Sequence, residues 1–192
     1  MPHESAPHPA LAALRELSET AARTADELAG DIARAATMVR DTVRRGGTLF
    51  FCGNGGSAAD AQHLATEYVV RYMRKRRAYP AVALTTDSSL LTAAANDLGF
   101  DEVFARQVEA LARPGDLLII HSTSGNSPNV LRAAEAARAK GVATIAFSAR
   151  DGGRLRAVAD HNVVVPTERT DRAQEIHLCI EHAICELVEG EL

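Results

Sequence analysis

Cysteine is scarce in this sequence, with only three in 192 residues. Cys52, Cys179 and Cys185 form no C-x-x-C pair and no His-rich finger pattern, and their odd number does not suit a closed disulfide framework. These absences argue against a disulfide-stapled scaffold and against a structural zinc finger. We expect reduced, mostly packed thiols, as in a cytosolic protein.

A basic charge balance and long apolar runs are also missing. The formal net charge of −4 argues against a general binder of nucleic acid or of anionic membranes, which needs a basic field. No apolar run reaches the roughly 18 residues of a membrane span, and the N-terminal stretch MPHESAPHPALAALRELSET has no continuous apolar core of a secretion signal. We therefore expect a soluble cytoplasmic protein that acts on a small molecule and binds neither nucleic acid nor a membrane.

What the sequence does contain is a regular alternation of helical and strand patterns. Residues 10–45 show apolar residues at helical spacing, with a break near Gly30 and a stop at Gly46 and Gly47. Beyond them we expect strands at 48–53, 81–86, 116–123, 142–149 and 162–166, and helices at 57–73, 88–111 with an interruption near Gly99, 128–140, 154–159 and 170–188.

The strands are almost wholly apolar and alternate with helices, which predicts a parallel sheet covered on both faces. The expected fold class is α/β, a three-layer αβα sandwich. A chain of this length suits one domain, with residues 1–46 as an N-terminal helical extension and residues 47–192 as the α/β core.

The stretch HSTSGNSPN, residues 121–129, carries hydroxyl groups between an expected strand and an expected helix. In open α/β sheets ligands bind beyond the carboxyl ends of the strands, and a helix N-terminus attracts anions. Four side chains there add donors: Ser122, Thr123, Ser124 and Ser127. The pattern favours a phosphate or carboxylate site, and an ordinary cap and turn is the alternative.

A second glycine-rich loop, CGNGGS at residues 52–57, also ends an expected strand just before a helix. Its glycines allow close backbone approach to a ligand, and Asn54 and Ser57 supply polar contacts. No lysine follows the glycines, so the loop is not a Walker A loop. Asp87 lies too far along the chain for a dinucleotide fingerprint, whose third glycine is also out of place.

Two expected helices carry groups suited to proton transfer or metal binding. His63 and Glu67 are spaced i, i+4 and so share one helix face. The last helix presents Gln174, His177 and His182, and spacing alone does not choose between the two histidines. Each of these groups also fits an ordinary solvated or packed position.

Five separated motifs occur in an order that covers nearly all the chain: GNGGSAADAQHLATE, AANDLGF, STSGNSPNV, ARDGG and DRAQEIH with a later His. In content and in order they resemble the phosphoheptose isomerases of the sugar isomerase (SIS) superfamily. The resemblance implies a flavodoxin-like SIS fold. It also implies isomerisation of sedoheptulose 7-phosphate to D-glycero-D-manno-heptose 7-phosphate through an enediolate, the opening step toward activated heptoses.

The same resemblance assigns roles to residues. It implies Glu67 and His182 as catalytic groups, and one zinc ion per subunit held by His63, Glu67, Gln174 and His182. It implies substrate contacts from Asn54, Gly55, Gly56, Ser57, Asn96, Asp97, Ser122, Thr123, Ser124, Ser127, Asp171 and Gln174. It further implies a homotetramer with sites at subunit interfaces.

Two alternatives stay open at the level of the sequence. A related SIS protein is a regulator that binds a replication initiator, and the basic segment RYMRKRR (71–77) could serve such binding. We favour a solvated helix end for this segment, with Arg71 near the sugar site, and we favour the enzyme over the regulator. An isomerase of another phosphosugar is the second alternative. His121 departs from the family pattern, which has an apolar residue before the serines.

Overall fold

The computed structural model describes residues 8–192, so the first seven residues of the N-terminal stretch analysed for a secretion signal lie outside it. The helices are α1 (Pro9–Glu27), α2 (Ala29–Arg44), α3 (Gly56–Val69), α4 (Ser88–Asp97), α5 (Ala105–Leu111), α6 (Pro128–Ala139), α7 (Leu155–Val158) and α8 (Thr170–Glu191), with a 3-10 turn η1 (Phe100–Glu102). The strands are β1 (Leu49–Gly53), β2 (Ala81–Ala83), β3 (Leu117–His121), β4 (Ala143–Ala149) and β5 (His161–Val165).

The five strands form one parallel sheet in the order β2-β1-β3-β4-β5. This is the doubly wound, flavodoxin-like order, whose topological switch point lies between β1 and β3. The register pairs Gly53 with His121 and His121 with Phe147, so the loops that leave β1 and β3 start side by side. The predicted three-layer sandwich is confirmed.

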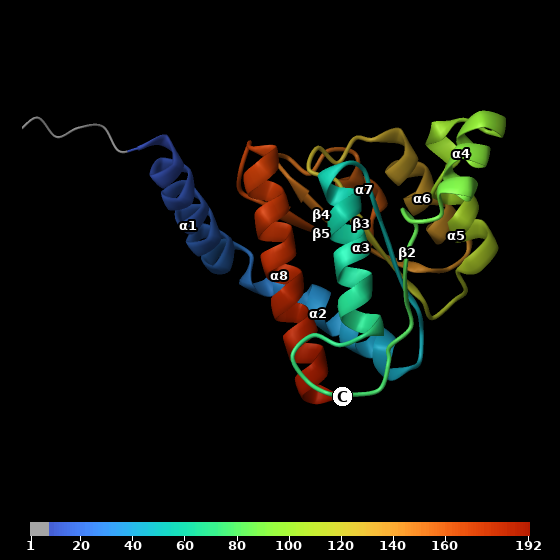
Figure 1. Ribbon diagram of the computed structural model, residues 1–192, viewed down its shortest axis with the longest axis horizontal. Coiled ribbons are helices and arrows are strands. Elements are labelled where there is room, and N and C mark those ends of the chain that lie inside the picture. The colour runs from blue at the N-terminus through green and yellow to red at the C-terminus, as the bar shows by residue number, and fades with distance from the viewer. Residues whose placement is uncertain (1–7) are drawn as a thin grey trace, which may run out of the picture.

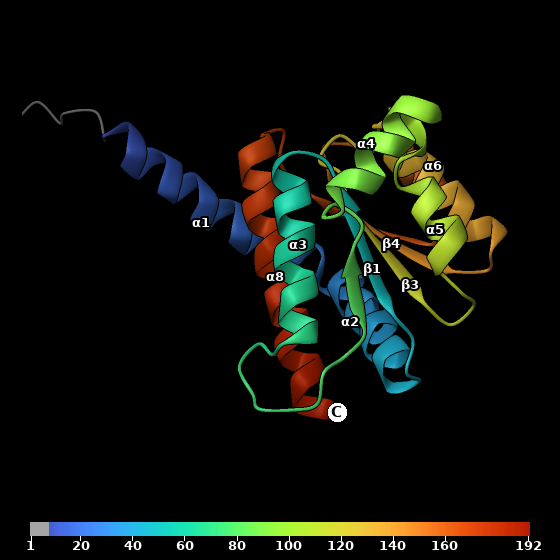
Figure 2. The same cartoon turned by 45° about the vertical axis from the view of Figure 1, so that its right-hand side comes forward.

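Both faces of the sheet are covered, which is why its strands are apolar throughout. Leu49 and Phe51 belong to a core shared with α2, α3 and α8, whereas Phe50 and Cys52 belong to a second core with α5 and α6. The layers and the adjacent positions of α3 and α8 can be followed in Figures 1 and 2.

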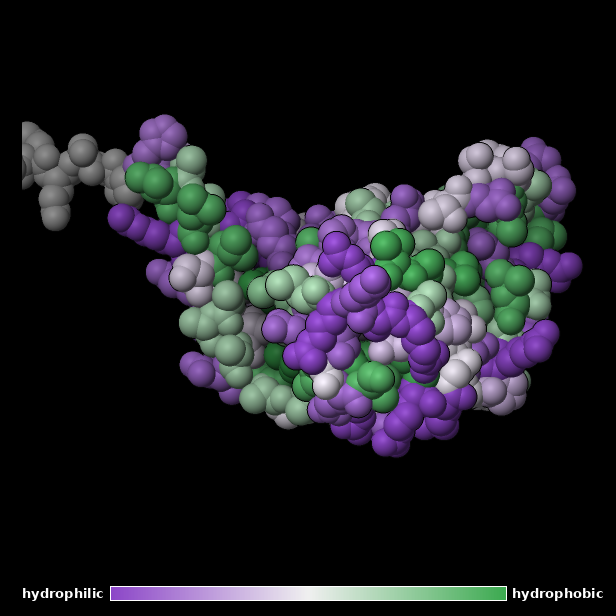
Figure 3. Space-filling model, turned by 60° about the horizontal axis from the view of Figure 1, so that its bottom comes forward, coloured by the Kyte–Doolittle hydropathy of each residue, from purple (hydrophilic) through white to green (hydrophobic). Residues whose placement is uncertain are grey.

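Helix α1 projects from one side of the molecule in both ribbon views. Its Leu11 and Leu14 are 51% and 62% exposed, and hydrophobic residues are visible along this helix in Figure 3. Among residues 8–192, no helix is long and apolar enough to cross a membrane.

All three cysteines are free, as expected from their spacing. Cys52 and Cys185 are buried, and Cys179 is exposed on α8. Burial raises the pKa of the Cys52 thiol and raises that of Cys185 to about 12, so both remain protonated at neutral pH.

Some predicted boundaries were wrong. The helix expected to reach residue 73 ends at Val69, so RYMRKRR is a loop and not a helix end. The strand expected at 81–86 stops at Ala83. The break expected near Gly30 is present between α1 and α2 at Leu28, and Gly30 itself lies within the first turn of α2.

Candidate functional site

A pocket of about 320 Å³ opens at the switch point between β1 and β3. It is lined by the two loops that follow these strands and by the start of α8. Its lining residues are Asn54, Gly55, Gly56, Ser57, His121, Ser122, Thr123, Ser124, Ser127, Thr170 and Gln174. The structure therefore brings together the two glycine- and serine-rich loops that the sequence singles out separately.

A pair of amides joins the two loops. Asn54 Nδ2 donates to Asn129 Oδ1 and Asn129 Nδ2 donates to Asn54 Oδ1, each at 2.8 Å. Asn129 lies in the first turn of α6 and is 2% exposed, so the reciprocal bond ties the loop after β1 to the helix after β3. No local sequence pattern indicates this role, although Asn129 is the last residue of the HSTSGNSPN stretch.

Two glycines permit close approaches that a side chain would block. A Cβ on Gly56 would lie 2.6 Å from Gln174 Nε2, so α3 and α8 begin in near contact. Gly125 has φ of +63°, and a Cβ there would lie 2.0 Å from the carbonyl oxygen of Gly152. The serine loop thus rests directly on the backbone that follows β4.

The serine loop is chemically suited to an anion. Ser127 is the N-cap residue of α6, yet its side chain makes no capping hydrogen bond. Its hydroxyl and the free amides of the first helical turn remain available to a ligand, and the helix dipole adds partial positive charge. A phosphate bound there would accept hydrogen bonds from backbone and side chains together.

A second group of polar side chains lies on α3 and α8, deeper along both helices. His63 Nε2 is 2.8 Å from His182 Nε2 and 3.4 Å from Glu67 Oε1. Burial and the neighbouring His63 hold the pKa of His182 below its ordinary value, despite the opposing charge of Glu67. The ligand atoms of these three residues lie within 4.8 Å of one another, and two imidazoles with one carboxylate are a donor set that divalent zinc accepts.

The pocket and this His–Glu–His cluster are separate in one chain. Gln174 Nε2 lies 3.5 Å from Ser57 Oγ, at the pocket, whereas His182 follows two turns later on α8, about 12 Å along the helix axis.

His121 is fully buried beneath the serine loop. Its Nε2 lies 2.6 Å from Glu181 Oε2, and its ring stacks against Phe51 and Phe147. Burial alone would lower the pKa of His121, but Glu181 and the nearby Asp60 raise it above its ordinary value. The unusual histidine therefore belongs to a buried ion pair with α8.

Comparison with known proteins places this architecture in a family. A family model described as SIS domain matches residues 14–149. The phosphoheptose isomerase of Chlorobaculum parvum is 57% identical over 177 residues, covering 91% of this chain and 83% of that protein. The chain belongs to the phosphoheptose isomerases of the SIS domain family.

Other phosphoheptose isomerases are similar to this chain over most of their length. The phosphoheptose isomerase of Aliarcobacter butzleri is 49% identical, covering 91% of this chain and 92% of that protein. A solved structure of phosphoheptose isomerase from Neisseria gonorrhoeae superposes with a TM-score of 0.89 at 42% identity, covering 94% of this chain and 97% of that one. The family resemblance carried by the five motifs is confirmed.

Three residues that the family resemblance assigns to the substrate lie outside the pocket of the single chain. Asn96 and Asp97 are exposed at the end of α4, where Asn96 Nδ2 donates to Asp97 Oδ1 at 2.7 Å. Asp171 is exposed in the first turn of α8 and pairs with Arg169, which lowers the pKa of its carboxyl. Conversely, Thr170 lines the pocket but is not among the site residues expected from the sequence. Its hydroxyl at the start of the last helix was a usable signal for a polar contact.

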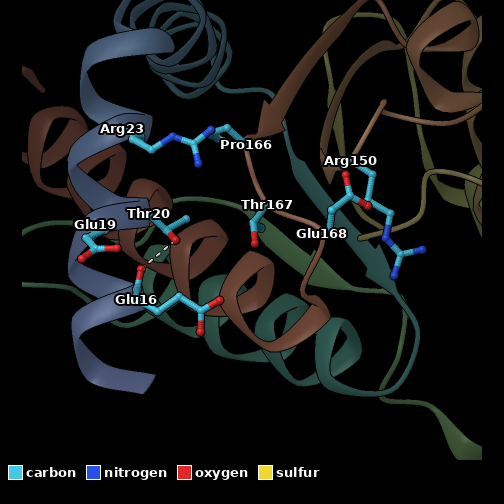
Figure 4. Close-up of a pocket in the computed structure, with 8 residues that line it drawn as sticks. All are labelled: Glu16, Glu19, Thr20, Arg23, Arg150, Pro166, Thr167 and Glu168. Atoms are coloured by element: carbon cyan, nitrogen blue, oxygen red, sulfur yellow. Dashed lines mark hydrogen bonds between the residues drawn. The ribbon is translucent and has the colours of Figure 1, made fainter. Parts of the chain in front are cut away.

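A larger cavity of about 450 Å³ lies between α1 and the segments that follow β4 and β5 (Figure 4). Arg23 and Arg150 border it, but so do three carboxylates: Glu16, Glu19 and Glu168. The excess of carboxylates disfavours a doubly charged phosphate. In this phosphoheptose isomerase family member, the lining of the switch-point pocket is better suited to an anion.

Proposed function

We propose that this protein interconverts sedoheptulose 7-phosphate and D-glycero-D-manno-heptose 7-phosphate in the cytoplasm, as an intramolecular oxidoreductase that begins activated heptose biosynthesis. The observation that carries the proposal is the 57% identity to a phosphoheptose isomerase over 91% of the chain. The polar pocket at the switch point supports it, because a sugar phosphate needs an anion site there. None of the relatives named above is a regulator, so the initiator-binding alternative has no support.

The reaction moves a proton between C1 and C2 through an enediolate. We assign Glu67 as the base that removes the proton from carbon, and His182 as the group that serves the sugar oxygens. Both lie in one cluster, with His63 between them. The neutral state favoured for His182 lets it accept a proton from a hydroxyl.

We propose one zinc ion per subunit, held by His63, Glu67 and His182. Gln174 was expected as a fourth ligand, but in one chain it lies at the pocket, two turns before His182 on α8, so it does not reach this cluster. The Nε2 atoms of the two histidines face each other beside the Glu67 carboxylate, which is the convergence of donors that a divalent cation needs. Without the cation, one imidazole N–H donates to the other nitrogen. The metal would polarise the sugar oxygens and stabilise developing negative charge. A carboxylate engaged as a ligand is a weaker base, so Glu67 serves both purposes at some cost in basicity.

Substrate recognition is assigned to the pocket. Ser122, Thr123, Ser124 and Ser127 would hold the phosphate, and its remote charge would orient the carbon chain toward the base. The remaining contacts are proposed for Asn54, Gly55, Gly56, Ser57, Asn96, Asp97, Asp171 and Gln174.

Replacing Gly125 with alanine tests the phosphate site. We expect KM for the ketose phosphate to rise about tenfold or more, because the new Cβ would displace the serine loop from Gly152. Gly141→Ala is the matched control, since Gly141 also has positive φ, +68°, but its Cβ would meet nothing within 4 Å. The control should lose about 1 kcal/mol of stability with KM unchanged. An equal KM for both variants in steady-state kinetics would contradict the assignment.

We further propose a single SIS domain that assembles as a homotetramer with sites shared between subunits. Two features support it: the exposed Leu11 and Leu14 on projecting α1, and the position of Asn96, Asp97 and Asp171 outside the pocket of one chain. Light scattering of the purified protein would measure the subunit number.

The decisive experiment is a coupled assay across phosphorylated C5, C6 and C7 ketoses. We expect turnover of the C7 substrate at a higher kcat/KM than either shorter ketose. Preference for a shorter ketose would assign a different phosphosugar isomerase, and no turnover of any ketose would refute the enzyme proposal. Metal analysis of protein never exposed to chelator tests the zinc separately.

A further inference from the structure

The loop that joins α3 to β2 is organised around one buried carboxylate, that of Glu189 on α8. The backbone amides of Tyr72, Met73 and Arg74 donate to its two oxygens at 2.7 to 2.8 Å. The Glu189 side chain is only 1% exposed. In both ribbon views the loop leaves the end of α3 and passes around the C-terminal end of α8 (Figures 1 and 2).

Arg76 joins the same carboxylate to the end of α3. Its Nε donates to Glu189 Oε1 at 2.8 Å, Nη2 to the carbonyl of Glu67 at 2.6 Å, and Nη1 to that of Tyr68 at 2.8 Å. These two carbonyls lie in the last turn of α3, where no intrahelical amide satisfies them. The guanidinium also lies 4.1 Å from the centre of the Tyr79 ring.

The Arg76–Glu189 pair is therefore a direct connection between two helices. Arg76 binds the backbone carbonyl of Glu67 on α3, and its partner Glu189 lies on α8, two turns beyond His182. Charge-assisted bonds of a planar guanidinium have restricted geometry, so they fix the separation of the helices as well as holding them together.

The loop also contacts the cluster itself. The Tyr72 ring stacks on the imidazole of His182, with centroids 5.1 Å apart and planes inclined by 15°. The neighbouring amide of Tyr72 is one of the three that Glu189 binds. The carboxylate that anchors the loop therefore also sets the position of the ring that lies against His182.

We propose that Arg76, Glu189 and Tyr72 are positioning residues that hold Glu67 and His182 in register for proton transfer. The two reactive groups belong to different helices, so their separation depends on what fixes α3 against α8. A displacement of about 1 Å at such groups can lower a rate by as much as a hundredfold. This proposal rests on the isomerase activity proposed above.

Glu189→Gln and Arg76→Lys test the pair. Glutamine keeps the size of the side chain but turns an amide group toward backbone donors, and lysine keeps the charge but cannot bridge Glu189 and both carbonyls. We expect kcat for the C7 ketose phosphate to fall between about tenfold and a hundredfold while KM changes less than about threefold, because the serine loop is untouched. Val142→Ala, a core substitution beside α6, is the control for lost stability alone and should leave kcat unchanged.

Tyr72 offers a second test that leaves the ion pair intact. Tyr72→Phe retains the ring and should retain kcat, whereas Tyr72→Ala should lower it. In metal-free protein, the ring protons of His182 should show an upfield NMR shift from the stacked Tyr72 ring. That shift should persist in Tyr72→Phe and Val142→Ala and disappear in Tyr72→Ala and Glu189→Gln.

The outcomes separate the two proposals. An inactive wild-type protein would refute the isomerase activity, and the NMR shift would still test the positioning of His182. An active wild type whose Glu189→Gln and Tyr72→Ala variants match Val142→Ala in kcat would overturn the positioning role. An NMR shift that is absent from the wild type or unchanged in Glu189→Gln would overturn it as well.

Discussion

Replacement of Glu67 with glutamine is expected to lower kcat for sedoheptulose 7-phosphate by about a hundredfold to ten-thousandfold, the contribution of a general base. Glutamine has the size of glutamate but cannot accept a proton from carbon. Glu67 is partly exposed, and within residues 8–192 its carboxylate makes one ionic contact, to His63 at 3.4 Å, so the fold should lose less than about 1 kcal/mol. His182→Gln should lower kcat to a similar degree.

Steady-state kinetics and thermal unfolding of the same samples measure both effects. Glu186→Gln on α8 is the control, because it removes an exposed carboxylate of the same type that lies outside the cluster. Full activity of Glu67→Gln or His182→Gln, in protein with a normal unfolding midpoint, would contradict the assigned roles.

Glu181→Leu should destabilise the protein by about 3 to 5 kcal/mol, since it leaves His121 buried without its charge partner. The double variant His121→Ile, Glu181→Leu removes the whole pair and should recover most of that loss. Its apolar side chains would pack between Phe51 and Phe147 without a desolvation cost. Urea unfolding of the wild type, both single variants and the double variant measures the coupling, and additive losses would contradict the ion pair.

The same pair predicts how stability depends on pH. The pKa of His121 is raised, so its stabilising contribution is complete below about pH 6.5 and is lost as pH rises through the raised value. Burial also raises the pKa of Glu181, so the contribution of its neutral form is complete below about pH 4.5 and is lost as pH rises through the raised value. His177 acts oppositely: burial lowers its pKa to about 3, so its contribution is lost as pH falls below about 6.5. Above about pH 6.5, the free energy of unfolding of the double variant, which lacks both His121 and Glu181, should vary less with pH than that of the wild type.

The sheet and most helices were predictable because their information is local. Apolar runs such as Leu117–Ile120 and glycine stops such as Gly141 mark elements without knowledge of their neighbours. The start of α6 was also predictable, because serine hydroxyls before Pro128 indicate a helix N-terminus directly.

The errors arose where a distant residue decides the local structure. Residues 70–73 have no helix breaker, yet α3 ends at Val69 because Arg76 and Glu189 satisfy its terminal carbonyls and the loop amides. Likewise, no local pattern indicates that His121 pairs with a carboxylate 60 positions away. Both are long-range polar contacts, which composition and periodicity do not encode.

The distribution of thiols has a practical consequence for spectroscopy. Two of the three cysteines are buried and remain protonated, whereas Cys179 is exposed on α8, one turn before His182. A maleimide-linked fluorophore or spin label should therefore attach at a single native position without mutagenesis. Such a label would report changes around the His63–Glu67–His182 cluster when substrate binds.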